Sequence, residues 1–192
     1  VYGKPGYGMQ ILRDYILGPE RFDEAFREYV RRWAFKSPKP EDFFRTMEDA
    51  AGADLAWFWR GWFYEPAALD QAIGSVTAKP RRGRVGVEIN NLRRMVMPVD
   101  MLVTYDDGST ERRRIPVEAW ARTDSFPTRW DSGGKSITRI EIDPDKWLPD
   151  VDRSNNVFEA DDGGDEPARD RLDHRNVPST QGESGSVKKS DD

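Results

Sequence analysis

Leu55-Ala56-Trp57-Phe58-Trp59-Arg60-Gly61-Trp62-Phe63 is the most aromatic stretch of the chain. In it, Leu55, Phe58, Trp59 and Trp62 recur at spacings of three and four residues, which places them on one face of a helix. Asp54 directly precedes the stretch, and its side chain can cap such a helix. The stretch therefore predicts a helix whose aromatic face is buried in a core.

The helical spacing extends back to the beginning of the chain. A first helix carries apolar side chains from Met9 to Ile16 and ends at Gly18-Pro19, where the chain cannot continue a helix. A second helix begins near Pro19 and carries an aromatic stripe. A third follows Pro40, with acidic residues in its first turn, and closes at Gly52. We expect about four helices in residues 1–68.

From about residue 73 the apolar period changes to two, which indicates β-strands. The alternating runs are Val85, Val87 and Ile89, then Val99, Met101, Val103 and Tyr105. Asp106-Asp107-Gly108-Ser109 has hairpin-turn chemistry, after which a strand from Thr110 runs to Ile115 and Val117. A last strand holds Ile140 and Ile142. The expected fold class is α+β, with a small antiparallel β-sandwich or open sheet in residues 73–158.

Residues 159–192 differ from the rest in composition and charge. They carry 10 acidic and 5 basic residues, whereas residues 1–158 carry 25 of each, so the net charge of -5 comes from this tail. With almost no apolar side chains, the tail cannot bury enough surface to offset its ordering entropy, and we expect it to be disordered. The balanced charge of residues 1–158 argues against nucleic acid as a partner. Several arginine groups could still converge into a basic patch, although solvated strand faces are the simpler interpretation: Arg81, Arg82 and Arg84, Arg93 and Arg94, and Arg112–Arg114.

The titratable residues exclude several kinds of catalytic site. The chain has no cysteine, and its single histidine, His174, lies in the tail, so neither a Ser/His/Asp triad nor a metal site of His and Cys ligands is expected. Carboxylates between Asp143 and Asp152 lack the spacing of a calcium loop, and we interpret them as turn residues. No apolar run is long enough to span a membrane.

Seven tryptophans raise a second hypothesis, a non-catalytic module that binds protein or glycan through exposed rings. Trp59 and Trp62 share a face with Leu55 and Phe58, which predicts that they are buried. The rings left as candidate exposed platforms are Trp57, Trp120, Trp130 and Trp147.

Residues 1–158 resemble the gluzincin zinc aminopeptidases, which include aminopeptidase N and leukotriene hydrolase. The matching segments of the helical part are Tyr2-Gly3-Lys4-Pro5, Gly8-Met9-Gln10-Ile11-Leu12-Arg13, Leu17-Gly18, Trp33-Ala34-Phe35-Lys36, Pro40-Glu41-Asp42-Phe43-Phe44, Gly52-Ala53-Asp54-Leu55 and Trp59-Arg60-Gly61-Trp62-Phe63. Those of the strand part are similar to bacterial members, and include Met97-Pro98-Val99, Pro116-Val117-Glu118 and Ile142-Asp143-Pro144.

The resemblance implies that the chain is the carboxy-terminal piece of a zinc metallopeptidase, inactive alone. In that family zinc polarises a peptide carbonyl, a glutamate activates a water, and a tyrosine matching Tyr2 hydrogen bonds the developing oxyanion. Zn²⁺ would belong to the parent protein, because the His-Glu-x-x-His helix is absent here. The implied partners are a peptide or protein substrate and the upstream part of the same catalytic domain. The suspected location is the bacterial periplasm or the cell exterior.

Overall fold

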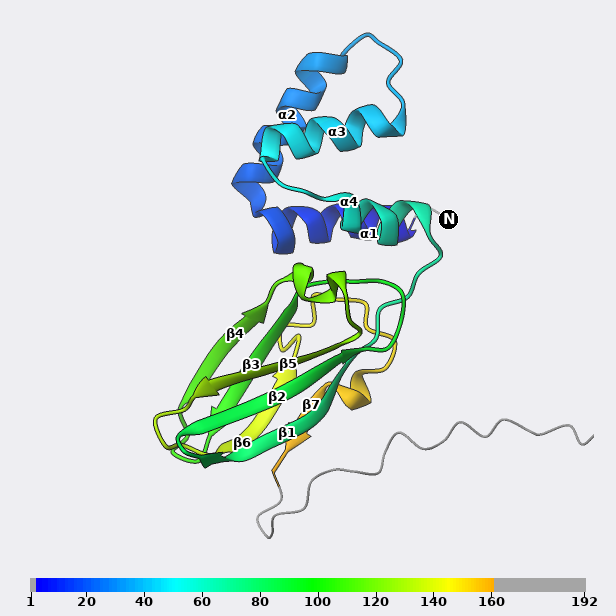
Figure 1. Ribbon diagram of the computed structural model, residues 1–192. Helices are drawn as coiled ribbons and strands as arrows, with labels where there is room; N and C mark the ends of the chain where they lie inside the picture. Colours follow the sequence, from blue (N-terminus) through cyan, green and yellow to red (C-terminus); the bar gives the residue numbers. More distant parts are fainter. Residues whose placement is uncertain (1–2, 161–192) are drawn as a thin grey trace, which may run out of the picture.

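A computed structural model describes residues 3–160, which fold into a helical part followed by two antiparallel sheets (Figure 1). The expected α+β class is confirmed. The helical part stacks on one end of the sheets, and the chain passes from one to the other after Tyr64.

Four helical stretches form the first part. Helix α1 (Gly3–Ile11) continues as a π-helical segment, η1 (Leu12–Leu17), and ends at Gly18. Helix α2 (Pro19–Trp33) begins with proline at its first position, where the missing N–H costs no hydrogen bond. Helix α3 (Pro40–Ala51) ends at Gly52, whose φ of 58° is left-handed and favours glycine. Helix α4 (Ala56–Trp59) continues as a π-helical segment, η2 (Arg60–Tyr64).

The predicted aromatic core of the helices is present. Phe58, Trp59 and Trp62 are buried, and Phe58 and Trp62 stack with ring centroids 5.6 Å apart. Glu48 of α3 accepts hydrogen bonds from the Leu55 amide and from the Trp59 indole, at 3.1 and 3.2 Å. This carboxylate joins α3 to α4. The expected cap differs: Leu55 is the N-cap residue of α4, and Asp54 accepts from the Ala56 amide at 3.0 Å, two residues on, as in an Asx turn.

Seven strands make a sandwich of two sheets. The first has the order β1-β2-β5 and consists of β1 (Gln71–Arg81), β2 (Arg84–Asn91) and β5 (Ser125–Asp131). The second has the order β4-β3-β6-β7 and consists of β3 (Val99–Tyr105), β4 (Thr110–Ile115), β6 (Ile137–Ile142) and β7 (Val157–Glu159). Val85, Val87 and Ile89 of one sheet and Val103 and Ile140 of the other belong to one buried cluster between them.

Two details of the expected strands differ. Val117 does not extend β4, because Pro116 has no N–H for the ladder and the chain turns there into a short 3₁₀ helix, η3 (Val117–Ala121). A second 3₁₀ helix, η4 (Arg153–Asn155), precedes β7. Strand β7 includes Glu159, the first residue assigned to the tail; the rest of the expected disordered tail, from residue 161, lies outside the described residues.

The helical part and the sandwich share apolar contacts. Met95, Met97 and Leu148, from loops at one end of the sandwich, are buried in the same cluster as the helical core. Met97 is fully buried, and its carbonyl accepts a 2.8 Å hydrogen bond from Trp120, whereas its sulfur lies 3.5 Å from the indole nitrogen of Trp62. Met97 therefore contacts both parts of the molecule.

Candidate functional site

Tyr2, the candidate catalytic residue, lies outside the described residues, which begin at Gly3. The site can therefore be built only from the segment that follows it. Helix α1 starts at Gly3, the residue after Tyr2, so its first turn is the described segment closest to Tyr2 in sequence.

Lys4 attaches the first turn of α1 to the end of η2. Its ammonium nitrogen donates to the carbonyl oxygens of Gly61, Glu65 and Ala67, at 2.8, 3.0 and 3.1 Å. Carbonyls at a helix end have no partner within the helix, and a lysine is suited to satisfy them. Burial lowers the pKa of Lys4, while the carboxylate of Glu65 acts in the opposite direction. Lys4 thus holds two segments together that are about 60 residues apart in sequence.

Gly8 allows α1 to lie directly against η2. A Cβ atom at this position would be 2.8 Å from Cε3 of the Trp62 indole, closer than carbon atoms can approach. One residue earlier, Tyr7 meets the same indole edge-on, with ring centroids 6.1 Å apart, and its hydroxyl donates to the Trp147 carbonyl at 2.8 Å. The beginning of α1 is therefore fixed by packing as well as by Lys4.

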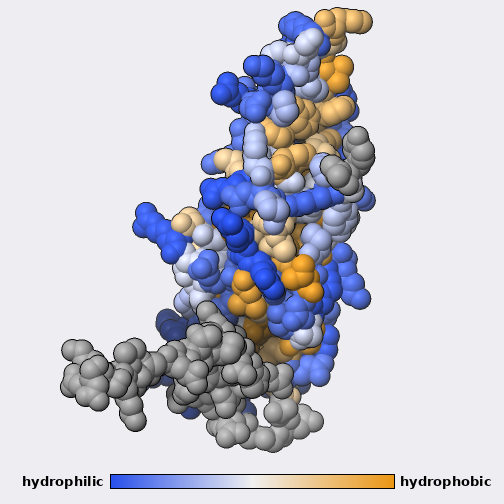
Figure 2. All heavy atoms as spheres, turned by 90° about the vertical axis from the view of Figure 1, so that its right-hand side faces the viewer, coloured by the Kyte–Doolittle hydropathy of each residue, from blue (hydrophilic) through white to orange (hydrophobic). Residues whose placement is uncertain are grey.

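A row of aromatic and aliphatic side chains is left exposed on the helices. Phe26 and Val30 of α2 are 43% and 50% exposed, and Tyr64 at the end of η2 is 58% exposed. Half-buried Phe43 links Phe26 to Tyr64, since its ring lies 6.4 Å from that of Phe26 and packs on the Phe44 ring, which in turn contacts Tyr64. We call Phe26, Val30, Phe43 and Tyr64 the apolar face. Figure 2 shows apolar side chains gathered along the helical part.

Phe35 is a further large apolar side chain that is exposed to solvent. It follows α2, has a φ of 62°, and is fully exposed. A left-handed conformation is uncommon for a bulky residue, and a fully exposed phenylalanine gains nothing from the hydrophobic effect.

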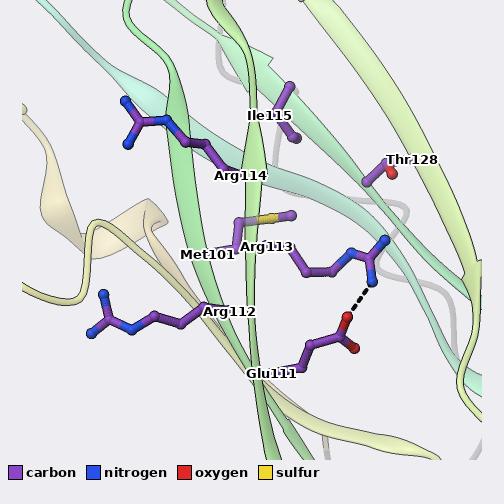
Figure 3. A pocket seen from close by; sticks show the side chains of 7 residues that line it. All are labelled: Met101, Glu111, Arg112, Arg113, Arg114, Ile115 and Thr128. Carbon is purple, nitrogen blue, oxygen red and sulfur yellow. Dashed lines mark hydrogen bonds and ion pairs between the residues drawn. The ribbon is translucent and has the colours of Figure 1, made fainter. Parts of the chain in front are cut away.

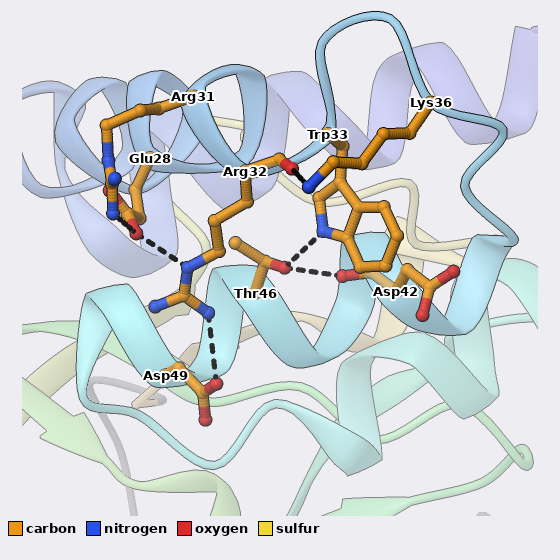
Figure 4. A network of polar contacts seen from close by, with 8 residues as sticks. All are labelled: Glu28, Arg31, Arg32, Trp33, Lys36, Asp42, Thr46 and Asp49. Carbon is orange, nitrogen blue, oxygen red and sulfur yellow. Dashed lines mark hydrogen bonds and ion pairs between the residues drawn. The ribbon is translucent and has the colours of Figure 1, made fainter.

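On another surface of α2 and α3 the charges are compensated (Figure 4). Glu28 accepts from Arg31 and Arg32, whose hydrogen bonds lower the pKa of its carboxyl to about 2. Arg32 also reaches Asp49 of α3 at 3.4 Å. The Trp33 indole donates to the Thr46 hydroxyl at 3.1 Å. A hollow lies here, lined by Glu24, Arg27, Glu28, Arg31, Arg32 and Ala50. We interpret this charged surface as structural, because its ion pairs join α2 to α3.

A second hollow lies on β4 (Figure 3), lined by Met101, Glu111, Arg112, Arg113, Arg114, Ile115 and Thr128. Arg113 points toward Glu111 and its guanidinium lies 4.4 Å from the Trp130 ring centroid. Arg112 and Arg114 point to the other side of the strand, where they pair with Asp145 and Asp100. The run Arg112–Arg114 is thus occupied by ion pairs and does not form a free basic patch.

The carboxylates after β6 serve as turn residues, as the sequence indicated. Asp143 is buried and accepts from the amides of Trp147 and Leu148 at 2.8 and 2.9 Å, and it also pairs with Arg153. Asp150 accepts from the Gln71 amide at 2.9 Å, which ties this loop to the start of β1.

Residues 3–160 offer no zinc site. Within them no three His, Cys, Asp or Glu side chains are grouped in a way that could hold a metal ion, and His174 lies outside this range. The described residues therefore do not fit the zinc centre of a metallopeptidase. Over the same range, no helix has the length and apolar character needed to cross a membrane.

The expectation of exposed tryptophan platforms is wrong for two of the four candidates. Trp120 and Trp130 are buried in the sandwich, and each indole donates a 2.8 Å hydrogen bond, to the Met97 carbonyl and the Tyr105 hydroxyl respectively. Trp57 and Trp147 are half-buried against the helical core. The predicted burial of Trp59 and Trp62 is confirmed.

Comparison with known proteins gives a likeness at the level of the fold. No protein-family model matches the chain, and neither does any curated protein. Among solved structures, the chain resembles aminopeptidase A of Legionella pneumophila, solved in complex with aspartic acid, with a TM-score of 0.55 at 15% identity. The likeness covers 76% of this chain but only 16% of that one. The chain therefore shares its fold with a small part of a known aminopeptidase.

Proposed function

We propose that this chain is a piece of a zinc-dependent aminopeptidase and contributes a transition-state-stabilising tyrosine, Tyr2, and one wall of the active-site cleft. The observation that carries the proposal is the fold shared with part of an aminopeptidase, together with the family-like segments that begin at Tyr2. The zinc ligands and the peptide-binding pocket would belong to the upstream part of the same catalytic domain.

Tyr2 is chemically suited to this role. A phenol keeps its proton near neutral pH, so it can donate a hydrogen bond to an oxyanion that appears only in the transition state. Such a donor needs a fixed position, because its value depends on geometry set before the reaction. Lys4 and Gly8 provide a rigid start to α1, directly after the segment that carries Tyr2.

The apolar face supports the second half of the proposal. Phe26, Val30 and Tyr64 expose large apolar side chains on the helical part, and Phe35, which follows α2, is fully exposed. In a larger catalytic domain these side chains would be covered by the upstream part, which would offset the cost of exposing them to water.

The test is a pair of matched substitutions in the longer aminopeptidase that this proposal implies. Tyr2→Phe is expected to reduce kcat by about 100- to 1000-fold, the usual effect of losing one oxyanion donor, while zinc content stays unchanged. Tyr7→Phe keeps the ring against Trp62 and removes only the hydroxyl that donates to the Trp147 carbonyl; it is the control and is expected to leave kcat close to that of the parent. Equal activity of Tyr2→Phe and the parent would remove Tyr2 from the mechanism. An upstream sequence without a metal-binding helix would remove the peptidase proposal altogether.

The 192-residue chain by itself gives a second readout. It is expected to bind zinc no better than a control protein and to release no amino acids from peptides, as measured by metal analysis and an amino-terminal cleavage assay. Zinc-dependent cleavage by the isolated chain would contradict the proposal.

The alternative, a non-catalytic module that binds protein or glycan through the sandwich, has less support. It relied on exposed tryptophans, and Trp120 and Trp130 are in the core. A glycan array probed with residues 1–160 would revive it if binding were lost on substitution of the half-buried Trp147 by alanine.

A further inference from the structure

Four arginines gather at the end of the sandwich that is opposite the helical part. Arg81 and Arg84 are cross-strand partners at the close of the β1–β2 hairpin, whose turn is Arg82-Gly83. Arg129 of β5 is on the neighbouring strand, paired with Gly86. All four arginine side chains are exposed. We call Arg81, Arg82, Arg84 and Arg129 the basic hairpin.

The charge of the basic hairpin is not compensated by the described residues. Within residues 3–160, none of its four guanidinium groups forms an ion pair or a hydrogen bond, in contrast to Arg112 and Arg153 elsewhere in the sandwich. Asp131 lies opposite Arg84 in the β2–β5 ladder, and its Oδ1 accepts from the Gly133 amide at 2.8 Å. Several like charges that lie close together on one surface attract anionic groups.

The backbone of the hairpin turn gives a further indication. Arg82 and Gly83 both have left-handed φ values, 55° and 77°, as a two-residue turn of this kind requires. Asn, Asp or Gly is the usual residue at the first of these positions, because other side chains are strained there. An arginine at this position adds positive charge to the tip of the hairpin at some cost in conformational energy.

The chain leaves the described structure at the same end of the sandwich (Figure 1). The Ala160 amide donates to the Thr138 carbonyl at 2.8 Å, at the start of β6. The loop that leads into β6 contacts the hairpin turn, since the Ser132 amide donates to the Gly83 carbonyl at 3.2 Å. The next residues of the sequence, 161–168, contain Asp161, Asp162, Asp165 and Glu166 and no basic residue.

We propose that the acidic segment 161–166 binds the basic hairpin of its own chain. Six extended residues span roughly 20 Å, and the segment follows Ala160, which lies at the same end of the sandwich as the hairpin tip. The short connection to Ala160 gives the segment a high effective concentration at the hairpin, so weak single ion pairs suffice together. The bound segment shields this cationic surface from other polyanions. The inference is independent of the peptidase proposal, because it uses no residue of the helical part.

The test uses paramagnetic broadening in the full 192-residue chain. The sequence has no cysteine, so Gly164→Cys gives one attachment site for a nitroxide label. At ~0.01 M salt, where the Debye length is ~30 Å, the amide signals of residues 81–84 and Arg129 are expected to lose more than about half of their intensity. At ~1 M salt, where the Debye length is ~3 Å, the signals are expected to recover.

Two matched variants and a mixed sample complete the design. Neutralising the segment with Asp161→Asn, Asp162→Asn, Asp165→Asn and Glu166→Gln is expected to restore the hairpin signals at low salt. The control, Asp191→Asn with Asp192→Asn, removes acidic residues far from the segment and is expected to leave the broadening unchanged. Mixing unlabelled isotope-enriched chain with spin-labelled chain is expected to give no broadening.

Three results would overturn the proposal. Broadening that persists at high salt or in the neutralised variant would mean that charge does not hold the segment. Broadening in the mixed sample would assign the contact to a second copy of the chain. Hairpin signals that are unaffected by the label, but that shift equally in both variants when a heparin fragment is added, would show that the basic hairpin serves an external polyanion.

Discussion

Single residues fix the beginning of α1, and Gly8 gives the clearest test at this scale. Gly8→Ala places a methyl group 2.8 Å from the Trp62 ring, so we expect the variant to lose about 1–3 kcal/mol of unfolding free energy, the usual cost of overpacking. Gly6→Ala is the matched control in the same helix. Its Cβ would meet nothing within 4 Å, and alanine is expected to stabilise the helix by about 0.5–1 kcal/mol. Urea denaturation of both variants measures the difference, and equal stabilities would contradict the close contact.

At the same scale, the sequence predicted which side chains are buried in a helix more readily than it predicted their long-range contacts. The burial of Trp59 and Trp62 follows from helical spacing with local neighbours. The bonds from Lys4 to carbonyls near residue 65 could not be predicted, because they join segments far apart in sequence. The same limit applies to Trp120 and Trp130, whose burial depends on which strands pair.

The element-scale prediction concerns the ion pairs on α2. Hydrogen bonds from Arg31 and Arg32 lower the pKa of Glu28 to about 2, below its ordinary value of 4.5. A depressed carboxyl pKa contributes stability that is present above the ordinary value and is lost as the pH falls toward 2. We therefore expect Glu28→Gln to flatten the loss of stability between pH 4.5 and pH 2, as followed by thermal melts. Glu24→Gln, one turn earlier on α2, is the control and should melt like the parent across this range; identical pH profiles for the two variants would exclude the Glu28 contribution.

Strands were predicted well where their pattern was regular. The alternation of Val85, Val87 and Ile89 correctly predicted β2, and the alternation from Val99 to Tyr105 correctly predicted β3. Strands β1 and β5 were not singled out, since β1 contains Gly74 and Pro80 and β5 contains Pro127, residues that usually weaken a strand pattern. Both are edge strands of their sheet, where proline is tolerated.

At the scale of the whole molecule, shared apolar contacts join the helical part to the sandwich, and the division into domains at residues 68 and 73 stays a prediction. Their shared cluster around Met97 leads us to expect one transition in the native chain. Met97→Ala removes a fully buried side chain at the shared contact and is expected to cost about 2–5 kcal/mol and to separate the two transitions. Val103→Ala, within the sandwich core, should lower stability while the parts still unfold together. Calorimetry distinguishes the outcomes, and two transitions in the native chain would show that the parts are uncoupled.

The distribution of the indole rings also makes such unfolding visible. Trp59 and Trp62 are in the helical core, whereas Trp120 and Trp130 are in the sandwich, each in a dry environment that shifts fluorescence emission to shorter wavelengths. Replacing one pair by phenylalanine, together with the remaining tryptophans Trp33, Trp57 and Trp147, leaves the other pair as the reporter. The protein thus carries two built-in optical probes, one for each part, with no need for an added dye.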